Sequence, residues 1–522
     1  MVTPVEMAAI DADAPEPVAT LIERAGMATA AEALRLLGGA YGKRVVVIAG
    51  KGNNGNDGRV AARRLAGRGV RVAVIGTTDP LPVGPRPDLI IDAAYGTGLR
   101  GGWSPPDVGD VPVLAVDLPS GVNGLTGEIG QTGGIGGQPA GVTAGGPLVL
   151  AASATVTFAG LKPGLLLGAG RLLAGRITLA DIGLDCSRAR VGLVTAHDLA
   201  AWLPRRSPDS HKWNAACWVV AGSATMPGAS HLCVAAAQRA GAGYVRLSSP
   251  GLAASPGAPT EAVYHQLAVT GWAETVAAEG GRFASLVVGP GLGRSEAGDV
   301  EIRRLVAVWD GPLVVDGDGL SALGERAASI LRSRRTPAVL TPHDGEFERL
   351  SGHRPGPDRI HEARALAAAT GAVVLLKGPA TVVADPAGRV GISMAGDARL
   401  ATAGTGDVLA GIIGALLAQG VPPWSAALAG AELHGRAAAQ GPARGLVAGD
   451  LLERITLVLN ADALAVNDPA NPASSARPAR PARPARPVPL PGAGELSGGW
   501  ELGFRRVVGA ATGTAGCWEP AP

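Results

Sequence analysis

The sequence predicts an α/β protein with two domains, each built on a parallel β-sheet, followed by a tail that lacks a regular fold. With 522 residues the chain is longer than one ordinary domain. In both halves, apolar strand-like runs alternate with helical segments, and glycine-rich loops follow several strands. Apolar residues make up 47% of the chain but aromatic residues only 3%, so Ala, Gly, Val and Leu must fill the cores.

Charge and cysteine content limit the classes of partner and compartment. The formal net charge is +2, which gives no reason to expect a nucleic-acid or acidic-membrane partner. Residues 1–10 lack the basic and apolar segments of a signal peptide, and the uncharged run at 140–161 reads as a soluble strand region rather than a membrane span. We therefore expect a cytoplasmic protein. The four cysteines lack CxxC spacing and favour free thiols: Cys186, Cys217, Cys233 and Cys517.

The first half contains a βαβ unit. A helix is predicted over 18–37, and residues 44–50 form a buried strand. A Gly/Asn loop at 51–58 then leads into a helix over 60–66, and the next strand covers 70–75. Strand, glycine-rich loop, helix and strand in this order predict a parallel sheet with Rossmann-like winding.

Polar residues follow the predicted strands of this half. Two further loops come after the apolar strands at 89–91 and 113–116, as ligand loops do at the carboxyl ends of a parallel sheet. Hard oxygen ligands of this kind suit an alkali or alkaline-earth cation, although any single acid here is equally well explained as a cap or turn residue. The residues expected to converge on one crevice are Asn54, Asp92, Asp117 and Ser120.

These three loops resemble those of the NAD(P)H-hydrate epimerase domain, and the resemblance spans about residues 5–185. That family has an Asn-Asn-Gly-Gly-Asp loop, a Gly-Thr-Gly loop and a Val-Asp-x-Pro-Ser-Gly loop. The resemblance implies a catalytic role for Asp117 and a potassium ion bound by Asn54, Asp92 and Ser120. It also implies a set of residues that hold the hydrated nicotinamide nucleotide: Asn53, Asn54, Gly55, Asn56, Asp57, Gly96, Thr97, Gly98, Leu99, Arg100, Gly101, Gly102 and Asp117.

The chain departs from the family pattern at Asn56, where the family usually has Gly. Because Asn tolerates positive φ better than other non-glycine residues, we expect the local fold to survive. The glycine-rich segment 130–146 is predicted to be an inserted, mobile loop.

The second half is predicted to be another α/β domain. A boundary near 194–210 interrupts the apolar pattern, which gives domains at 1–193 and 194–466. A helix is predicted over 229–240. Strands are predicted at 217–221, 244–248, 286–289, 313–316, 338–341 and 373–376.

The segment 402–411 organises this second domain. It is a Gly-Thr-Gly-Asp turn that runs directly into an apolar helix. Backbone N–H groups at a helix N-terminus favour a phosphate, and the same field is expected to keep Asp407 ionised so that it can accept a proton. The alternative is a glycine loop in which Asp407 is only a helix cap.

With this turn, the loops at 289–293, 316–319, 341–346 and 377–381 resemble the ADP/ATP-dependent NAD(P)H-hydrate dehydratase family, which has a ribokinase-like fold. The likeness runs from about 211 to 459 and departs from the family at 213–217. It implies that the hydrate contacts Ala229, Gly293, His343 and Asp407, although His343 is also explained as a structural residue. The residues implied to lie along the nucleotide are Lys377, Gly378, Pro379, Ala380, Thr381, Gly404, Thr405 and Gly406.

The two resemblances imply one repair function for hydrated NADH and NADPH, abbreviated NADHX and NADPHX. The first domain would interconvert the R and S hydrates. In the second, Asp407 would direct the ring hydroxyl at the terminal phosphoryl group of ADP or ATP with Mg²⁺, and phosphate loss would restore the cofactor. A homo-oligomer is also expected. The alternatives are a ribokinase-like small-molecule kinase and a first domain that only binds nucleotide.

The composition changes from residue 467 onward. An Ala-Arg-Pro repeat begins at 476 and reaches 487. Because arginine spaced by proline cannot pack a core, residues 467–522 are predicted to be extended or disordered. A basic docking peptide is the alternative.

Overall fold

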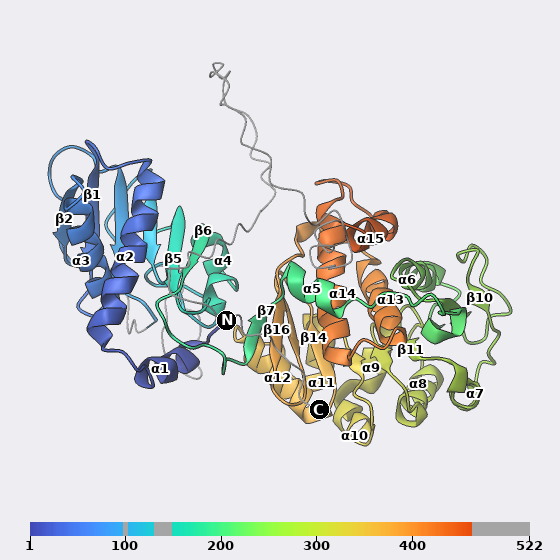
Figure 1. Ribbon diagram of the computed structural model, residues 1–522. Helices are drawn as coiled ribbons and strands as arrows, with labels where there is room; N and C mark the ends of the chain where they lie inside the picture. The colour runs from blue at the N-terminus through green and yellow to red at the C-terminus, as the bar shows by residue number, and fades with distance from the viewer. Residues whose placement is uncertain (98–102, 130–148, 462–522) are drawn as a thin grey trace, which may run out of the picture. The chain divides into compact units, whose positions relative to one another are not determined.

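The computed structural model describes residues 1–97, 103–129 and 149–461, which form two compact units (Figure 1). The first unit ends at Arg190 and the second begins at Val191. Strand β7 (Val191–Leu193) pairs with β16 (Val390–Ser393) of the second sheet, so the second unit begins three residues before the predicted position. The predicted mobile loop at 130–146 and the predicted tail at 467–522 lie outside the described residues.

The first unit is a six-stranded parallel sheet, as its sequence predicts. The strands occur in the order β2-β1-β3-β4-β5-β6, and every neighbouring pair is parallel. Helices α2 (Val18–Leu37) and α3 (Asn53–Ala66) pack on one face through a shared apolar core. A separate cluster that includes Trp103 and Leu150 covers the other face. The strands are β1 (Arg44–Ala49), β2 (Arg71–Ile75), β3 (Leu89–Ala93), β4 (Val113–Val116), β5 (Ala154–Phe158) and β6 (Arg176–Ala180).

The Gly/Asn segment after β1 differs from the prediction, because α3 begins at Asn53 rather than at residue 60. A Cβ added to Gly55 would lie 1.9 Å from the carbonyl oxygen of Gly50. This glycine therefore allows the start of the helix to pack closely against the end of β1. Asn56 lies inside the helix, and the described non-glycine residues with positive φ are Asp117 and Ala159. The expectation that Asn56 replaces a glycine at positive φ is therefore wrong.

The second unit is a ten-stranded mixed sheet in the order β10-β9-β8-β11-β12-β13-β14-β15-β16-β7. All neighbours are parallel except that β15 is antiparallel to both β14 and β16. The remaining strands are β8 (Ala216–Val220), β9 (Tyr244–Ser248), β10 (Val263–Tyr264), β11 (Ser285–Val288), β12 (Leu313–Val315), β13 (Val339–Leu340), β14 (Val373–Leu376) and β15 (Thr381–Ala384).

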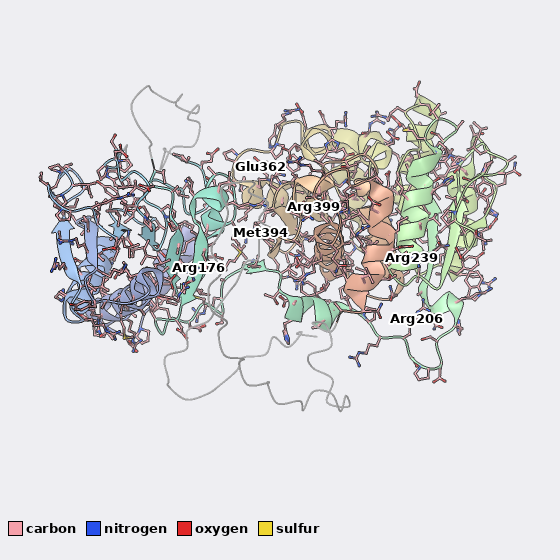
Figure 2. All side chains as sticks on the ribbon, turned by 90° about the horizontal axis from the view of Figure 1, so that it is seen from above. Arg176, Arg206, Arg239, Glu362, Met394 and Arg399 are labelled. Carbon is pink, nitrogen blue, oxygen red and sulfur yellow. The ribbon has the colours of Figure 1, made fainter. Side chains whose placement is uncertain are left out.

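One face of this sheet is buried under α6 (Pro227–Arg239), α13 (Thr405–Ala418), α14 (Pro423–Ala439) and α15 (Leu451–Leu459), which share one apolar core with the strands. Figure 2 labels Arg239, which is the last residue of α6. A Cβ on Gly411 of α13 would lie 2.1 Å from the Cys233 carbonyl oxygen, so α6 and α13 cross in close contact.

The structure describes nine further α-helices in the two units. None of the helices in the described ranges is long and apolar enough to cross a membrane. The helices not yet named are α1 (Pro4–Ala12), α4 (Gly170–Leu173), α5 (Ala196–Trp202), α7 (Trp272–Glu279), α8 (Glu296–Val308), α9 (Asp318–Leu323), α10 (Ala327–Leu331), α11 (Asp344–Ser351) and α12 (Arg359–Thr370).

Candidate functional sites

The first site lies at the carboxyl ends of β1, β3 and β4, where three loops meet. Asn54 is in the first turn of α3, Gly96 follows β3, and Asp117 follows β4 directly. A Cβ added to Gly96 would lie 3.6 Å from Asn54 Cβ and 3.9 Å from Asp117 Oδ2. The structure thus brings together residues from all three predicted loops.

Asp117 is held in an unusual backbone conformation by several contacts. Its φ is 66°, and its N–H donates to the Val156 carbonyl oxygen at 2.7 Å. Its Oδ1 atom accepts a hydrogen bond from Thr157 Oγ1 at 2.9 Å and pairs with Lys162 Nζ at 2.6 Å. Lys162 is 2% exposed and also donates to the Phe158 carbonyl oxygen at 2.9 Å. A strained residue that is fixed this firmly is typical of a functional site.

Asp57 is a second buried carboxyl group in this crevice, with an exposed fraction of 7%. Burial, followed by the negative charge of Asp117, raises the pKa of Asp57 to about 8, and the Lys162 charge opposes this shift. Asp57 is therefore protonated at neutral pH, whereas Asp117 is paired with the lysine.

The third feature of this crevice is a set of oxygen atoms that fits a monovalent cation. Both polar side-chain atoms of Asn54 are buried and lack a hydrogen-bond partner among the described residues. Asp92 is fully buried and accepts from Ser120 through Oγ at 2.6 Å and through N–H at 2.9 Å. Burial raises the pKa of Asp92 to about 6, against these hydrogen bonds. A cation beside Asp92 and Asn54 Oδ1 would favour the ionised carboxylate and satisfy the amide oxygen.

The second site surrounds the N-terminus of α13. Gly404 precedes the helix with a φ of 90°, and Lys377 follows β14. Lys377 Nζ pairs with Asp316 Oδ1 at 2.7 Å, and it would lie 3.4 Å from a Cβ on Gly406. Glu346 Oε2 is 4.0 Å from the same ammonium group. A lysine charge thus lies at a helix start that can bind phosphate.

Asp407 occupies the same helix start, but its charge state differs from the prediction. Burial raises the pKa of Asp407 to about 7, with a further contribution from Asp316, while Lys377 opposes the shift. The expectation that the helix field alone keeps Asp407 ionised is therefore wrong. Desolvation and the neighbouring carboxylates outweigh that field, and the resulting pKa suits a general base at neutral pH.

His343 has a clear structural role as the N-cap of α11. Its Nδ1 accepts from the N–H groups of Gly345 at 3.0 Å and Glu346 at 3.3 Å. The carboxylate of Glu346 in turn accepts from the His343 N–H at 2.9 Å. Nδ1 is therefore occupied as the acceptor of the helix cap, and Nε2 is the other ring nitrogen that could meet a ligand. This is the structural alternative considered from the sequence, and a substrate contact through Nε2 stays a prediction.

Among the other residues predicted for the second site, Ala229 lies in the first turn of α6 and Thr381 begins β15, while Gly293 and residues 378–380 lie in loops. The N–H of Gly293 donates to Asp318 Oδ2 at 2.8 Å, and a Cβ on Gly291 would lie 2.6 Å from Ala229 Cβ. The turn at 377–380 joins the antiparallel pair β14 and β15, and Arg359 Nη2 fixes it by donating to the Lys377 carbonyl oxygen at 2.6 Å.

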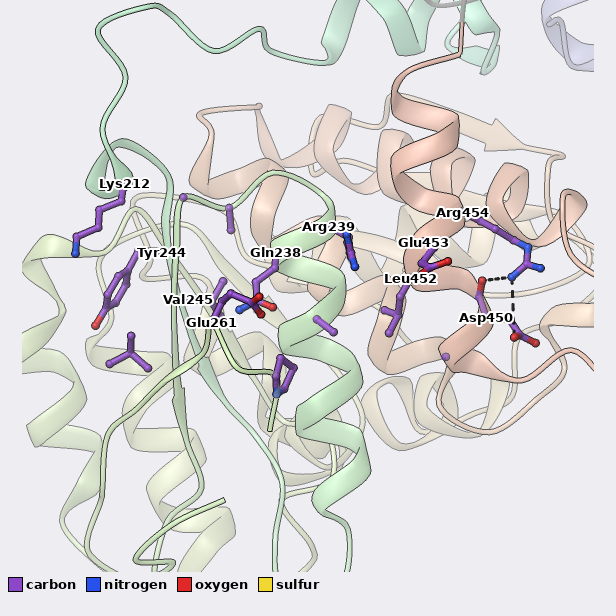
Figure 3. Close-up of a pocket in the computed structure, with 16 residues that line it drawn as sticks. Lys212, Gln238, Arg239, Tyr244, Val245, Glu261, Asp450, Leu452, Glu453 and Arg454 are labelled. Atoms are coloured by element: carbon purple, nitrogen blue, oxygen red, sulfur yellow. Dashed lines mark hydrogen bonds and ion pairs between the residues drawn. The ribbon is translucent and has the colours of Figure 1, made fainter. Parts of the chain in front are cut away.

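A cavity of about 810 Å³ lies away from all these residues, along the carboxyl-terminal end of α6 (Figure 3). It is lined by acidic and basic side chains in equal measure, including Arg239, Glu261 and Glu453. We assign the chemistry to the strand ends instead, because the perturbed carboxyl groups and the lysine ion pairs lie there.

Comparison with known proteins covers both units. The family model for NAD(P)H-hydrate dehydratase matches residues 217–471, and the model for the YjeF-related protein N-terminus matches 18–83 and 76–164. The bifunctional NAD(P)H-hydrate repair enzyme Nnr of Mycobacterium tuberculosis strain H37Rv is 39% identical over 451 residues, covering 79% of this chain and 87% of that protein. This chain belongs to the bifunctional NAD(P)H-hydrate repair enzyme family.

Other members of the repair enzyme family are similar over the same range. The Escherichia coli K12 protein of that name is 34% identical over 472 residues, covering 81% of this chain and 86% of its own. A solved structure of the ADP/ATP-dependent NAD(P)H-hydrate dehydratase from Bacillus subtilis, co-crystallized with ATP/Mg²⁺, is 30% identical with a TM-score of 0.45. It covers 52% of this chain and 98% of its own.

Four residues contact predicted site residues but were not themselves predicted as site residues: Thr157, Lys162, Asp316 and Glu346. Asp316 and Glu346 belong to loops that the sequence analysis singled out, at 316–319 and 341–346, and this was the available signal for them. The importance of all four residues appears only when the partners Asp117 and Lys377 are in place. The predicted residues Gly98, Leu99, Arg100, Gly101 and Gly102 lie outside the described residues.

Proposed function

We propose that this chain repairs hydrated NADH and NADPH with two active sites, one in each unit. The first unit interconverts the R and S hydrates, and the second dehydrates the S hydrate with ADP or ATP. The observation that carries the proposal is Asp407, whose pKa of about 7 places a carboxyl group near its titration point beside Lys377 and the helix start. The relatives span both units, so a small-molecule kinase with an inert first domain is not favoured.

In the dehydratase site, Asp407 takes the proton of the ring hydroxyl as the oxygen attacks the terminal phosphoryl group. The N–H groups at the start of α13 and the Lys377 ammonium stabilise the charge on the transferring group. Loss of phosphate then restores the dihydronicotinamide. We assign Gly404, Thr405 and Gly406, with the turn at 377–381, to the nucleotide.

Two metal ions belong to this proposal. Mg²⁺ usually binds substrate phosphates, water and only one or two carboxylates. Asp316 and Glu346 fit that need, and the described residues contain no cluster of three metal-binding side chains. When bound, Mg²⁺ neutralises phosphate charge. We assign K⁺ to Asn54, Asp92 and Ser120, because Asn54 has an unsatisfied buried oxygen there. The cytoplasmic location and the homo-oligomeric state stay predictions.

Paired substitutions test the two-site proposal. We expect Asp407→Asn to lower S-hydrate dehydration by about 100-fold or more, because the proton acceptor is lost. Epimerisation should remain at the wild-type rate, because Asp407 belongs to the other unit. Asp117→Asn should give the reverse pattern. Dehydration is followed by recovery of dihydronicotinamide absorbance and phosphate release, and epimerisation by chromatography of the two hydrates. Loss of both activities in either variant would contradict two separate sites.

A further inference from the structure

The crevice of the first unit holds a second buried carboxyl group, Asp57, that has no stated task beyond ligand binding. Asp57 follows Asn54 by three residues on α3, so the two side chains share one face of the helix. A Cβ added to Gly96 would lie 3.6 Å from Asn54 Cβ and 3.9 Å from Asp117 Oδ2, so the helix face that carries Asn54 lies near Asp117. In the described part of the chain, the Asp57 side chain makes no hydrogen bond or ion pair, although its exposed fraction is only 7%.

The contacts and charges around the two carboxyl groups differ. Lys162 pairs with Asp117 Oδ1 at 2.6 Å, and Thr157 donates to the same oxygen. These two contacts occupy Oδ1 and leave Oδ2 as the oxygen that faces Gly96. The pKa of Asp57 is raised to about 8, first by burial and then by the negative charge of Asp117. The positive charge of Lys162 opposes this shift but is the smallest of the three effects. At neutral pH the crevice therefore contains a protonated carboxyl group, Asp57, near a second carboxyl group that pairs with a buried lysine.

We propose that Asp57 and Asp117 form an acid–base pair that removes the ring hydroxyl from one face of the hydrate and returns it on the other. This inference rests on the proposed epimerase function. It assigns Asp57 as the proton donor, Asp117 Oδ2 as the proton acceptor, and Lys162 as a positioning residue that pairs with Asp117 Oδ1.

The chemistry of the substrate permits this exchange, because the hydroxyl group is on C6, the ring carbon bonded to N1. Asp57 gives its proton to the hydroxyl oxygen, and the C6–O bond breaks with its electron pair going to that oxygen, which leaves as water. The N1 lone pair forms an N1=C6 double bond, so the ring carries a positive charge. A water molecule then adds to C6 on the opposite face, gives a proton to Asp117, and the double-bond pair returns to N1.

The step balances without an oxidant or a reductant. At its end Asp57 is ionised and Asp117 is protonated, and the reverse reaction on the other epimer restores the starting state. Two acid–base groups that exchange roles match a reaction that must run in both directions.

The first test is Asp57→Asn in the full-length protein, assayed for interconversion of purified hydrates without ADP. We expect epimerisation to fall by about 100-fold or more. Dehydration of the S hydrate with ADP should stay unchanged, which shows that the second unit is folded, and a thermal unfolding curve like that of the wild type shows the same for the first unit. The wild-type rate should fall as pH rises through about 8, where Asp57 loses its proton, and the variant should lack this decline. Epimerisation at the wild-type rate in Asp57→Asn would overturn the assignment.

Asp11→Asn is the matched control. Asp11 on α1 also senses Lys162 and Asp117, but it is exposed, so this variant should epimerise like the wild type. A loss equal to that of Asp57→Asn would mean that replacing any carboxyl group near Lys162 and Asp117 is sufficient, and it would overturn a specific role for Asp57.

The second test is epimerisation in ¹⁸O-labelled water, corrected for exchange without enzyme. The proposed pair predicts one labelled oxygen for each inversion, because the C6–O bond breaks. Inversion with the original oxygen retained would indicate opening of the N1–C6 bond and would overturn the mechanism. A wild-type protein that dehydrates the S hydrate but never interconverts the epimers would instead refute the epimerase function, and the acid–base pair with it.

Discussion

Asp57 and Asp92 are buried carboxyl groups and Asp407 is half-buried, and each one has different neighbours. Burial raises the pKa of all three. Asp57 faces another carboxylate, whereas Asp92 adjoins the proposed cation site and Asp407 has both Asp316 and Lys377 as neighbours. The same desolvation thus supports a proton donor, a cation ligand and a proton acceptor.

The pH dependence of dehydration follows from Asp407. Because the pKa of this group is raised to about 7, the carboxyl is protonated below neutral pH and cannot accept the hydroxyl proton. We expect kcat for S-hydrate dehydration to rise with pH through about 7 and then level off. The measurement is kcat at saturating ADP and hydrate across neutral pH. A kcat that stays constant through this range, with chemistry limiting the rate, would exclude Asp407 as the base.

At the scale of elements, the start of α3 is set by packing rather than by helix propensity. Gly and Asn are poor helix formers, yet residues 53–58 are helical because glycines let α3 approach the end of β1. Gly52 and Gly55 offer a comparison. Gly52 is the residue just before α3 and Gly55 lies in its first turn, and neither has a positive φ. A Cβ at Gly55 meets the Gly50 backbone, whereas nothing lies within 4 Å of a Cβ at Gly52.

We therefore expect Gly55→Ala to destabilise the first unit by about 1–3 kcal/mol or more, because the Gly50 backbone must move. Epimerisation should fall with it, since the same turn carries Asn54. Gly52→Ala should behave like the wild type. Thermal unfolding and the epimerisation assay check both variants, and dehydration should be retained in each. Equal stability of Gly55→Ala and Gly52→Ala would contradict this packing.

The contrast between local sequence pattern and tertiary packing also explains which elements could be predicted from the sequence. The central strands are short apolar runs, and their predicted ends fall within one residue of the observed ends at 244–248 and 373–376, and within two residues at 89–91. Strands β15 and β16 were not predicted from the sequence. Their positions depend on pairing with β14 and β7, which only the tertiary fold provides. The three loops of the first site could be predicted because parallel strand ends share one edge. Lys162 could not be assigned, because its role depends on a contact with Asp117 that only the fold creates.

At the scale of the whole molecule, two units with separate cores hold two sites with complementary chemistry. In the proposed mechanism the dehydratase site accepts one epimer, because its proposed base and phosphoryl-transfer groups would address one face of the ring. The epimerase site converts the other epimer into that substrate. A chain that carries both sites can therefore consume a mixture that a dehydratase alone would leave half used.

Recovery of a mixed hydrate preparation tests this central claim most directly. The wild-type protein is incubated with R and S hydrates, ADP, Mg²⁺ and K⁺, and dihydronicotinamide absorbance is followed to completion. We predict recovery of both epimers, faster than their spontaneous interconversion, with one phosphate released for each cofactor restored. Recovery that stops at the S fraction would contradict the epimerase assignment, and no recovery with ADP or ATP would contradict the dehydratase assignment.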